Sequence, residues 1–159
     1  ANVMVSLLGV SDDDRRDNVE GYIRSEIMTD GEQLLPAFYP VIKPMDHDWE
    51  ELNMTFSYTF KNNPHEYHNG GLWPMISGFY AADLARRGAP EAARTHLKEI
   101  HKANRLEMDG EPWSFPEYVH GRDRTAGGTR RLGWSAAGAV IGHFALEGKP
   151  FFRIGDDDA

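Results

Sequence analysis

No cysteine occurs in the chain, which excludes disulfide bonds, thiolate metal ligands and cysteine nucleophiles. Long apolar runs are absent as well, because the longest ones are too short and too often interrupted to cross a bilayer. Both observations are consistent with a cytoplasmic protein. We expect no membrane partner.

Positive charge is scarce and scattered. The chain has 17 lysines and arginines against 25 aspartates and glutamates, so its formal charge is −8. No isolated basic cluster could neutralise the phosphates of a duplex. We therefore expect no nucleic-acid partner, and an anionic membrane surface is disfavoured for the same reason.

The chain opens with Ala1 instead of a methionine and enters an apolar helical pattern at Val3, with no capping pattern ahead of it. Its 159 residues are enough for one domain with a sizeable core. We expect residues 1–159 to be a segment of a longer protein.

Helical periodicity is the main pattern that the chain does have. Apolar residues recur at helical spacing in five segments, over residues 3–8, 11–27, 73–87, 90–103 and 132–147. Ser11, followed by Asp14 three residues later, predicts the cap of the second segment. The first, third and fifth segments should be buried, whereas the second and fourth are amphipathic and should be peripheral.

This alternation of buried and peripheral helices predicts an all-α fold built from concentric rings of helices. Three buried and two peripheral helices do not close a ring. The chain is therefore expected either to form an arc of a larger barrel or to pack against copies of itself.

Residues 67–74 (Tyr-His-Asn-Gly-Gly-Leu-Trp-Pro) connect a polar, turn-forming run to the third helix. The two glycines allow a tight loop, and Pro74 suits the first turn of a helix. Backbone donors at this helix start, beside Trp73 and His68, would suit the hydroxyls and C–H faces of a neutral polyol. The alternative is an ordinary helix start whose tryptophan and histidine serve the core.

Two long loops precede the third and fifth helices, and loops of this length inside a domain are usually functional. The first, residues 28–67, mixes aromatic and acidic residues that a sugar site could use, although it could equally be a cover held by its own aromatics. Its candidates are Tyr39, Asp46, His47, Asp48, Trp49 and Tyr58.

The second loop, residues 105–128, contains Glu117 between Pro116 and Tyr118, close to Trp113 and Phe115. A carboxylate in aromatic surroundings can act as a base on water beside a sugar ring. Such a hydrolase also needs a protonated carboxyl group for the leaving oxygen. The residues that qualify by type, none of them singled out by its context, are Asp46, Asp48, Glu66, Asp109 and Asp123.

Four stretches together resemble the neutral/alkaline invertases. Residues 67–74 resemble the family's Tyr-His-Asn-Gly-Gly-Ser-Trp-Pro run, and residues 115–121 (Phe-Pro-Glu-Tyr-Val-His-Gly) are similar to its Trp-Pro-Glu-Tyr-Tyr-Asp-Gly segment. Residues 37–40 (Ala-Phe-Tyr-Pro) with 47–49 (His-Asp-Trp) are similar to its Tyr-Pro and His-Glu-Trp segment. Residues 134–138 (Trp-Ser-Ala-Ala-Gly) are similar to its Trp-Ser-Ile-Ala-Gly helix.

The resemblance implies a six-hairpin α/α barrel, as in the related debranching-type glucosidases, of which residues 1–159 would be the C-terminal part of the catalytic domain. It implies an inverting glycoside hydrolase in which Glu117 is the catalytic base, while the family's general-acid aspartate lies outside this chain. The residues expected to shape the sugar site are Tyr39, Trp49, His68, Asn69, Gly70, Trp73 and Trp134.

The implied partners are a small carbohydrate, such as sucrose or a short oligosaccharide, and either the remainder of the polypeptide or a second copy of the chain. No cofactor is implied. Leu72, Phe115, Leu132 and Gly133 depart from the family pattern, so a debranching-type α-1,6-glucosidic substrate is the alternative to sucrose.

Two other classes remain open. One is a non-catalytic helical module that binds carbohydrate or protein. The other is a metallohydrolase using His65, Glu66 and His68 near Asp46, His47 and Asp48. The run His-Glu-Tyr-His lacks the i, i+4 pair that places two imidazoles on one helical face, so we expect no metal site.

Overall fold

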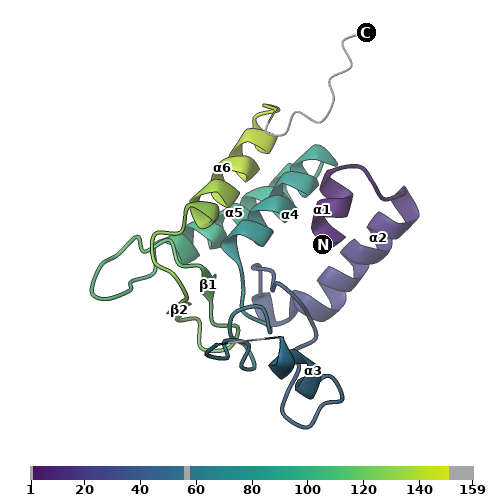
Figure 1. Cartoon of the computed structure of the whole chain (residues 1–159). Helices are drawn as coiled ribbons and strands as arrows, with labels where there is room; N and C mark the ends of the chain where they lie inside the picture. Colours follow the sequence, from purple (N-terminus) through teal and green to yellow (C-terminus); the bar gives the residue numbers. More distant parts are fainter. Residues whose placement is uncertain (1, 56–57, 151–159) are drawn as a thin grey trace.

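All five predicted helices are present in the computed structural model, which describes residues 2–55 and 58–150 (Figure 1). They are α1 (Asn2–Leu7), α2 (Asp13–Tyr22), α4 (Pro74–Arg86), α5 (Pro90–Asn104) and α6 (Gly133–Leu146). A π-helical turn (Ile23–Ile27) continues α2, and a 3-10 turn (Thr29–Gly31) follows it.

The predicted all-α class is confirmed. In the described residues, paired strands are limited to a two-residue antiparallel ladder of β1 (Tyr118–Val119) and β2 (Ala126–Gly127). This ladder is a connection between loop segments and builds no layer of its own.

The sequence analysis missed one helix and misplaced one cap. The missed helix is α3 (Trp49–Met54), none of whose six residues is buried, so it has no apolar side that faces the core. The cap of α2 is Asp12, and the prediction of Ser11 was wrong. The Asp12 carboxylate accepts a hydrogen bond from the Arg15 N–H at 2.8 Å, which satisfies one of the unpaired donors of the first turn.

Helix α4 is the centre of the fold. It packs against α1, α5 and α6 (Figure 1), and eight of its 13 residues are buried, which confirms the predicted inner helix. The core around it draws on α4, α5 and the loops before α4 and α6. Its buried members include Leu34, Leu35, Leu72, Tyr80, Leu84, Leu97, Ile100 and Val119.

A buried polar network attaches the first two helices to α4. The Asp83 carboxylate accepts hydrogen bonds from the Ser6 hydroxyl at 2.8 Å and from the Arg87 Nε at 3.1 Å. Arg87 also donates to Glu20 of α2 at 2.5 Å. Because Asp83 is buried, its charge needs these partners, and the network therefore locates α1 and α2 on α4.

The outer face of α6 carries exposed apolar side chains. Trp134, near the start of the helix, is 60% exposed; Val140 is 50% and Phe144 39% exposed, and these two are four residues apart on one side of the helix. The opposite side of α6 consists of small buried residues that face α4 and α5. The expected inner helix is thus covered on one side only in this chain.

The backbones of α4 and α6 approach each other at two glycines. A Cβ atom added to Gly138 would lie 2.8 Å from the Met75 Cα and 2.8 Å from the Pro74 carbonyl oxygen, and one added to Gly78 would overlap the backbone of Gly138. Since backbone atoms cannot move aside as a flexible side chain can, only glycine fits at this crossing.

We predict that Gly138→Ala lowers the free energy of unfolding by at least about 1–3 kcal/mol, the usual cost of overpacking, because α6 must move away from α4. Urea denaturation followed by circular dichroism measures it. Gly133→Ala is the control in the same helix, since a Cβ there meets no atom within 4 Å. Equal stability of the two variants would contradict the close approach.

Candidate functional site

The two long loops meet at the N-terminal ends of α4 and α6 (Figure 1). Leu72 and Val119 exchange a pair of backbone hydrogen bonds, each 2.8 Å long. The Gly121 N–H also donates to the His65 carbonyl at 2.9 Å. This pairing places the segment containing Glu117 beside the loop of residues 67–73.

The Glu117 side chain is held by the backbone of the turn after β2. Its Oε2 accepts a hydrogen bond from the Thr129 N–H at 2.9 Å, while its own N–H donates to the Thr129 carbonyl at 3.0 Å. Gly128 lies against it with φ of +77°, and an added Cβ would come within 2.6 Å of Oε2. The carboxylate is therefore positioned by backbone atoms and is half-buried.

Four aromatic rings stack beside Glu117. The Tyr67 and His68 rings are 4.0 Å apart, the His68 and Trp73 rings 5.2 Å, and the Trp73 and Tyr118 rings 6.4 Å. The Trp73 Nε1 donates to the Tyr67 carbonyl at 2.9 Å. We call these four residues the aromatic cluster.

The electrostatics link the aromatic cluster to Glu117. Burial lowers the pKa of His68, and the negative charge of Glu117 partly opposes that shift. Burial raises the pKa of Tyr67 and of Tyr118, and Glu117 raises both further. At neutral pH the site thus combines a neutral imidazole and two protonated phenols with the Glu117 side chain.

Several residues in these loops have a positive φ, which is uncommon for bulky side chains, and Tyr67 and Phe115 are two of them. The φ angles of Tyr67 and Phe115 are both +44°. Such conformations cost about 1–3 kcal/mol each and concentrate at active sites, where the surrounding structure enforces them. They mark the two sides of the junction between the loops as candidates for function.

Asn69 and Gly70 hold the loop from inside. Asn69 is fully buried, and its Nδ2 donates to the carbonyls of Ile42 at 2.7 Å and Asn62 at 3.0 Å. Its Oδ1 accepts from the Ile42 N–H at 2.8 Å. Gly70 has φ of +82°, and a Cβ there would overlap the side chain of Val41. Both residues therefore shape the loop and do not offer their own polar atoms to a ligand.

Trp73, at the start of α4, is likewise not open to a ligand. Trp73 is 4% exposed, and its backbone N–H donates to the Leu35 carbonyl at 2.8 Å. Its ring stacks against the ring of His68. The idea of an exposed helix start that binds a polyol is thus wrong for Trp73, because the loop before α4 covers it.

Two of the predicted tryptophans, Trp49 and Trp134, lie outside the aromatic cluster. Trp49 begins α3 and packs edge-on against Phe60 at 5.6 Å. Trp134 is exposed near the start of α6, two residues after Leu132, whose N–H donates to the Phe115 carbonyl at 3.0 Å. Trp134 therefore borders the Glu117 loop, whereas α3, which contains Trp49, lies apart from it (Figure 1).

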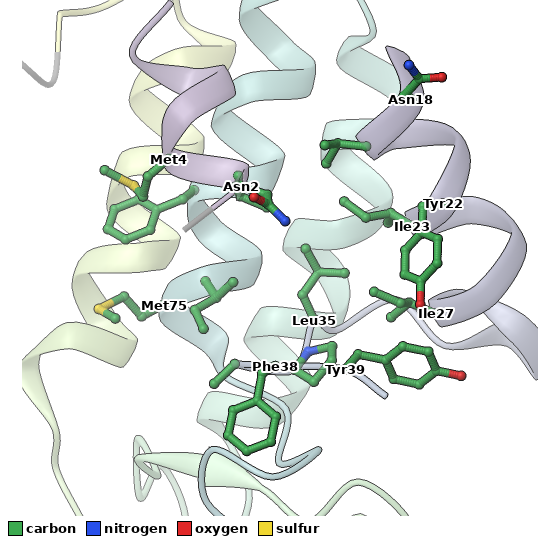
Figure 2. A pocket seen from close by; sticks show the side chains of 16 residues that line it. Asn2, Met4, Asn18, Tyr22, Ile23, Ile27, Leu35, Phe38, Tyr39 and Met75 are labelled. Atoms are coloured by element: carbon green, nitrogen blue, oxygen red, sulfur yellow. The ribbon is translucent and has the colours of Figure 1, made fainter. Parts of the chain in front are cut away.

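Tyr39 belongs to a groove that the sequence analysis did not anticipate. This apolar groove has a volume of about 710 Å³ and lies between α1, α2, α4 and residues 35–39. Figure 2 shows Tyr39 next to Tyr22 and Ile27, with Met75 and Met4 on the opposite side. The rings of Tyr39 and Tyr22 meet edge to face at 6.3 Å.

The side chains considered for a metal site are dispersed. His47 pairs with Asp48 on the surface at 2.8 Å, whereas the ring of His65 lies 6.1 Å from that of His120. Within residues 2–55 and 58–150, no three histidine, aspartate or glutamate side chains form a group that could hold a metal ion. No helix in this part of the chain is long and apolar enough to span a membrane.

Comparison with known proteins identifies the family. Residues 25–148 match the model for alkaline and neutral invertases. The chain belongs to this family. The resemblance noted in the sequence is therefore confirmed, and the two loops that form the site lie within the matched residues.

Several plant invertases are similar to this chain. Cytosolic invertase 1 of Oryza sativa subsp. japonica is 32% identical over 120 residues, which cover 74% of this chain and 19% of that protein. An alkaline/neutral invertase of Arabidopsis thaliana is 32% identical over the same length, covering 74% and 20%. A chloroplastic alkaline/neutral invertase E of Arabidopsis thaliana is 33% identical over 89 residues, covering 54% and 14%. The chain thus spans about a fifth of the length of the first two of these invertases.

Four residues of this candidate site were not predicted from the sequence. Tyr67 and Tyr118 belong to the matched motifs and could have been chosen, because each adjoins a residue that was chosen. Gly128 and Thr129 had no such signal. They follow Glu117 by more than ten residues, and only the β1–β2 turn returns them to the carboxylate.

We predict that Asn69→Ala destabilises the chain by at least about 2 kcal/mol, since a buried polar group that loses its partner costs about 1–3 kcal/mol and three such bonds are lost. Urea denaturation measures it. Asn63→Ala is the control, because that exposed amide makes one side-chain hydrogen bond, to Glu66, and should change stability by less than about 0.5 kcal/mol. A fully stable Asn69→Ala variant with weakened sugar binding would return Asn69 to a direct binding role.

Proposed function

We propose that this chain supplies the catalytic base of an inverting glycoside hydrolase that cleaves an α-glucosidic bond of a small sugar such as sucrose. One observation carries the proposal: the Glu117 carboxylate is fixed by the Thr129 N–H at the place where the aromatic cluster ends. Membership of the invertase family supports the choice of glycoside hydrolysis. A cytoplasmic location is proposed with it, supported by the rice relative, whose name includes the word cytosolic.

In this mechanism the ionised Glu117 accepts a proton from a water molecule as the water attacks the anomeric carbon. A separate carboxylic acid protonates the leaving oxygen, and in inverting enzymes the two carboxyl groups are about 6.5–9.5 Å apart, which leaves room for the water. We place that acid in the part of the invertase domain outside residues 1–159. The Thr129 N–H helps by fixing one carboxylate oxygen, so the other can face the water.

The sugar would rest on the accessible rings. Trp73 is too buried for direct contact, so we assign it the support of His68, whose neutral imidazole can donate or accept a hydrogen bond. Trp134 offers an exposed indole face beside the Glu117 loop, which suits the C–H face of a sugar ring. Leu72 belongs to the core, so its departure from the family pattern does not bear on the substrate.

The complete enzyme tests the role of Glu117. In a protein that contains this chain within a whole invertase domain, we predict that Glu117→Gln lowers kcat by about 10²–10⁴-fold, the usual contribution of a general base, and leaves KM within a few-fold. The reason is that the amide keeps the shape of the carboxylate and cannot accept the proton. Initial rates on sucrose and on a short α-1,6-glucoside measure it.

Glu107→Gln is the matched control, an exposed glutamate in the same long loop, and should leave both constants unchanged. A Glu117→Gln variant with raised KM and unchanged kcat would assign Glu117 to substrate binding. Turnover of the α-1,6-glucoside in place of sucrose would keep the mechanism and change the substrate.

We further propose that the outer face of α6 and the apolar groove are covered by the remainder of the invertase domain. Large contiguous apolar surfaces are uncommon on soluble monomers. The chain alone should therefore self-associate, and without the general acid it should hydrolyse no glycoside.

Sedimentation velocity at increasing concentration tests this proposal. We predict that Val140→Glu, at a half-exposed position on the outer face of α6, reduces self-association, because it places a charge in the contact. Val10→Glu is the control in the turn between α1 and α2, where Val10 is 74% exposed. A chain that stays monomeric at every concentration, or that cleaves sucrose by itself, would contradict the proposal.

A further inference from the structure

A second pocket, of about 740 Å³, opens next to the junction of the two loops. Its charged and titratable lining consists of Lys43, His65, His120, Arg122 and Asp123, and two prolines complete the wall. We call it the basic pocket. It shares no lining residue with the apolar groove and contains neither Glu117 nor a ring of the aromatic cluster.

Three segments far apart in the sequence bring these side chains together. Lys43 lies in a turn closed by a hydrogen bond from its backbone N–H to Asp46 at 2.7 Å. His65 is fixed on both sides, since its N–H donates to the Asn69 carbonyl at 2.7 Å and its carbonyl accepts from Gly121. The pocket walls are thus held by the same backbone bonds that form the loop junction.

His120 is held by its own turn. Its Nδ1 accepts hydrogen bonds from the N–H groups of Arg122 at 3.2 Å and Asp123 at 3.0 Å. An imidazole that accepts at Nδ1 carries its proton on Nε2 when neutral, so it still presents an N–H donor. The Asp123 carboxylate, 3.7 Å from Nδ1 and mostly exposed, is the acidic group of the pocket lining.

The lysine and the arginine of the pocket, Lys43 and Arg122, have no counter-ion. Among the lysines and arginines that the structure describes, all but Lys43, Lys98 and Arg122 have a side chain in an ion pair, a hydrogen bond or a contact with an aromatic ring. In a chain with formal charge −8, two of these three unpaired cations face the same pocket. Lys98 lies on α5 and is not part of it.

The surroundings of His65 reflect this excess of positive charge. Burial is the main reason why the pKa of His65 is lowered, and the charges of His120, Arg122 and Lys43 lower it further. Asp123 opposes them. A bound anion would reverse the electrostatic part of this shift and let the imidazole accept a proton.

We propose that the basic pocket binds a phosphate group, either as the free ion or as the monoester of a sugar. Arg122 can donate two parallel hydrogen bonds to phosphate oxygens, and Lys43 contributes a point charge. His65 and His120 supply further donors to the remaining oxygens. A phosphate dianion matches this many donors better than a carboxylate, which offers only two oxygens.

The proton NMR signals of the His65 and His120 rings provide the test. The 159-residue chain is titrated at pH 6.5 and constant ionic strength with sodium phosphate and, separately, with glucose 6-phosphate. We expect saturable shifts of both histidines. Lys43→Ala and Arg122→Ala should each weaken binding about tenfold, because each removes a charge-assisted contact.

Lys98→Ala is the matched control, since it removes the third unpaired cation from outside the pocket and should change the affinity by less than about twofold. Circular dichroism establishes that each variant is folded. Tighter binding of the ester identifies a sugar phosphate as the ligand, and equal or tighter binding of the inorganic ion identifies free phosphate.

A titration with sulfate measures how anion binding depends on pH, because sulfate stays a dianion from pH 6 to 8. Its binding should weaken as the pH rises, because His65 then loses the proton, and with it the positive charge, that a bound anion stabilises. Three results would overturn the proposal: no saturable shift of either histidine, an equal loss of affinity in Lys98→Ala and Arg122→Ala, or sulfate binding that is independent of pH. None of these results bears on Glu117, so the proposed hydrolase function stands or falls separately.

Discussion

The backbones of α4 and α6 touch where Gly78 meets Gly138, and the position of the site depends on this contact. Each helix begins at the same end of the molecule, and each is preceded by a long loop. When the two helices are this close, their preceding loops have to meet, and the hydrogen bonds between Leu72 and Val119 join them. Glu117 and the aromatic cluster are neighbours because two glycines allow two helices to touch.

Hydrogen bonds within the loops fix their conformation. Their polar groups are used internally, as in the buried amide of Asn69, or are aimed at one functional carboxylate, as in the Thr129 N–H. A buried amide that makes three hydrogen bonds fixes a loop as firmly as a short element of secondary structure. The strained φ angles of Tyr67 and Phe115 persist because this framework enforces them.

The same junction has two chemically different sides. One presents Glu117 with aromatic rings and a neutral imidazole, which suits an uncharged sugar. The other presents Lys43, Arg122 and two histidines, which suit an anion. An acidic chain can therefore carry a local basic pocket, because charge at short range is set by which side chains converge and not by the total.

Much of the fold was predictable from the sequence. The periods of α1, α2, α4, α5 and α6 are long enough, and their punctuation by Gly9, Gly88, Pro90 and Gly148 clear enough, to locate five helices. The short helix α3 was not predictable, because six residues with no buried face have no period. The choice between Ser11 and Asp12 as the cap depended on which side chain accepts a hydrogen bond from the Arg15 N–H.

The site, too, was predictable from the sequence only in part. Glu117, His68 and Trp73 could be named because they lie in short motifs of the invertase family, so the local sequence was enough to recognise them. That Asn69 and Trp73 are buried, that Tyr39 faces the apolar groove, and that Gly128 and Thr129 hold Glu117 followed only from the way distant segments pack. The sequence by itself determined which side chains are present and which segments are helical, since these depend on composition and on short-range periodicity. Only the tertiary structure decided which groups are exposed, paired or left without a counter-ion, because burial and convergence arise from contacts between residues far apart in the chain.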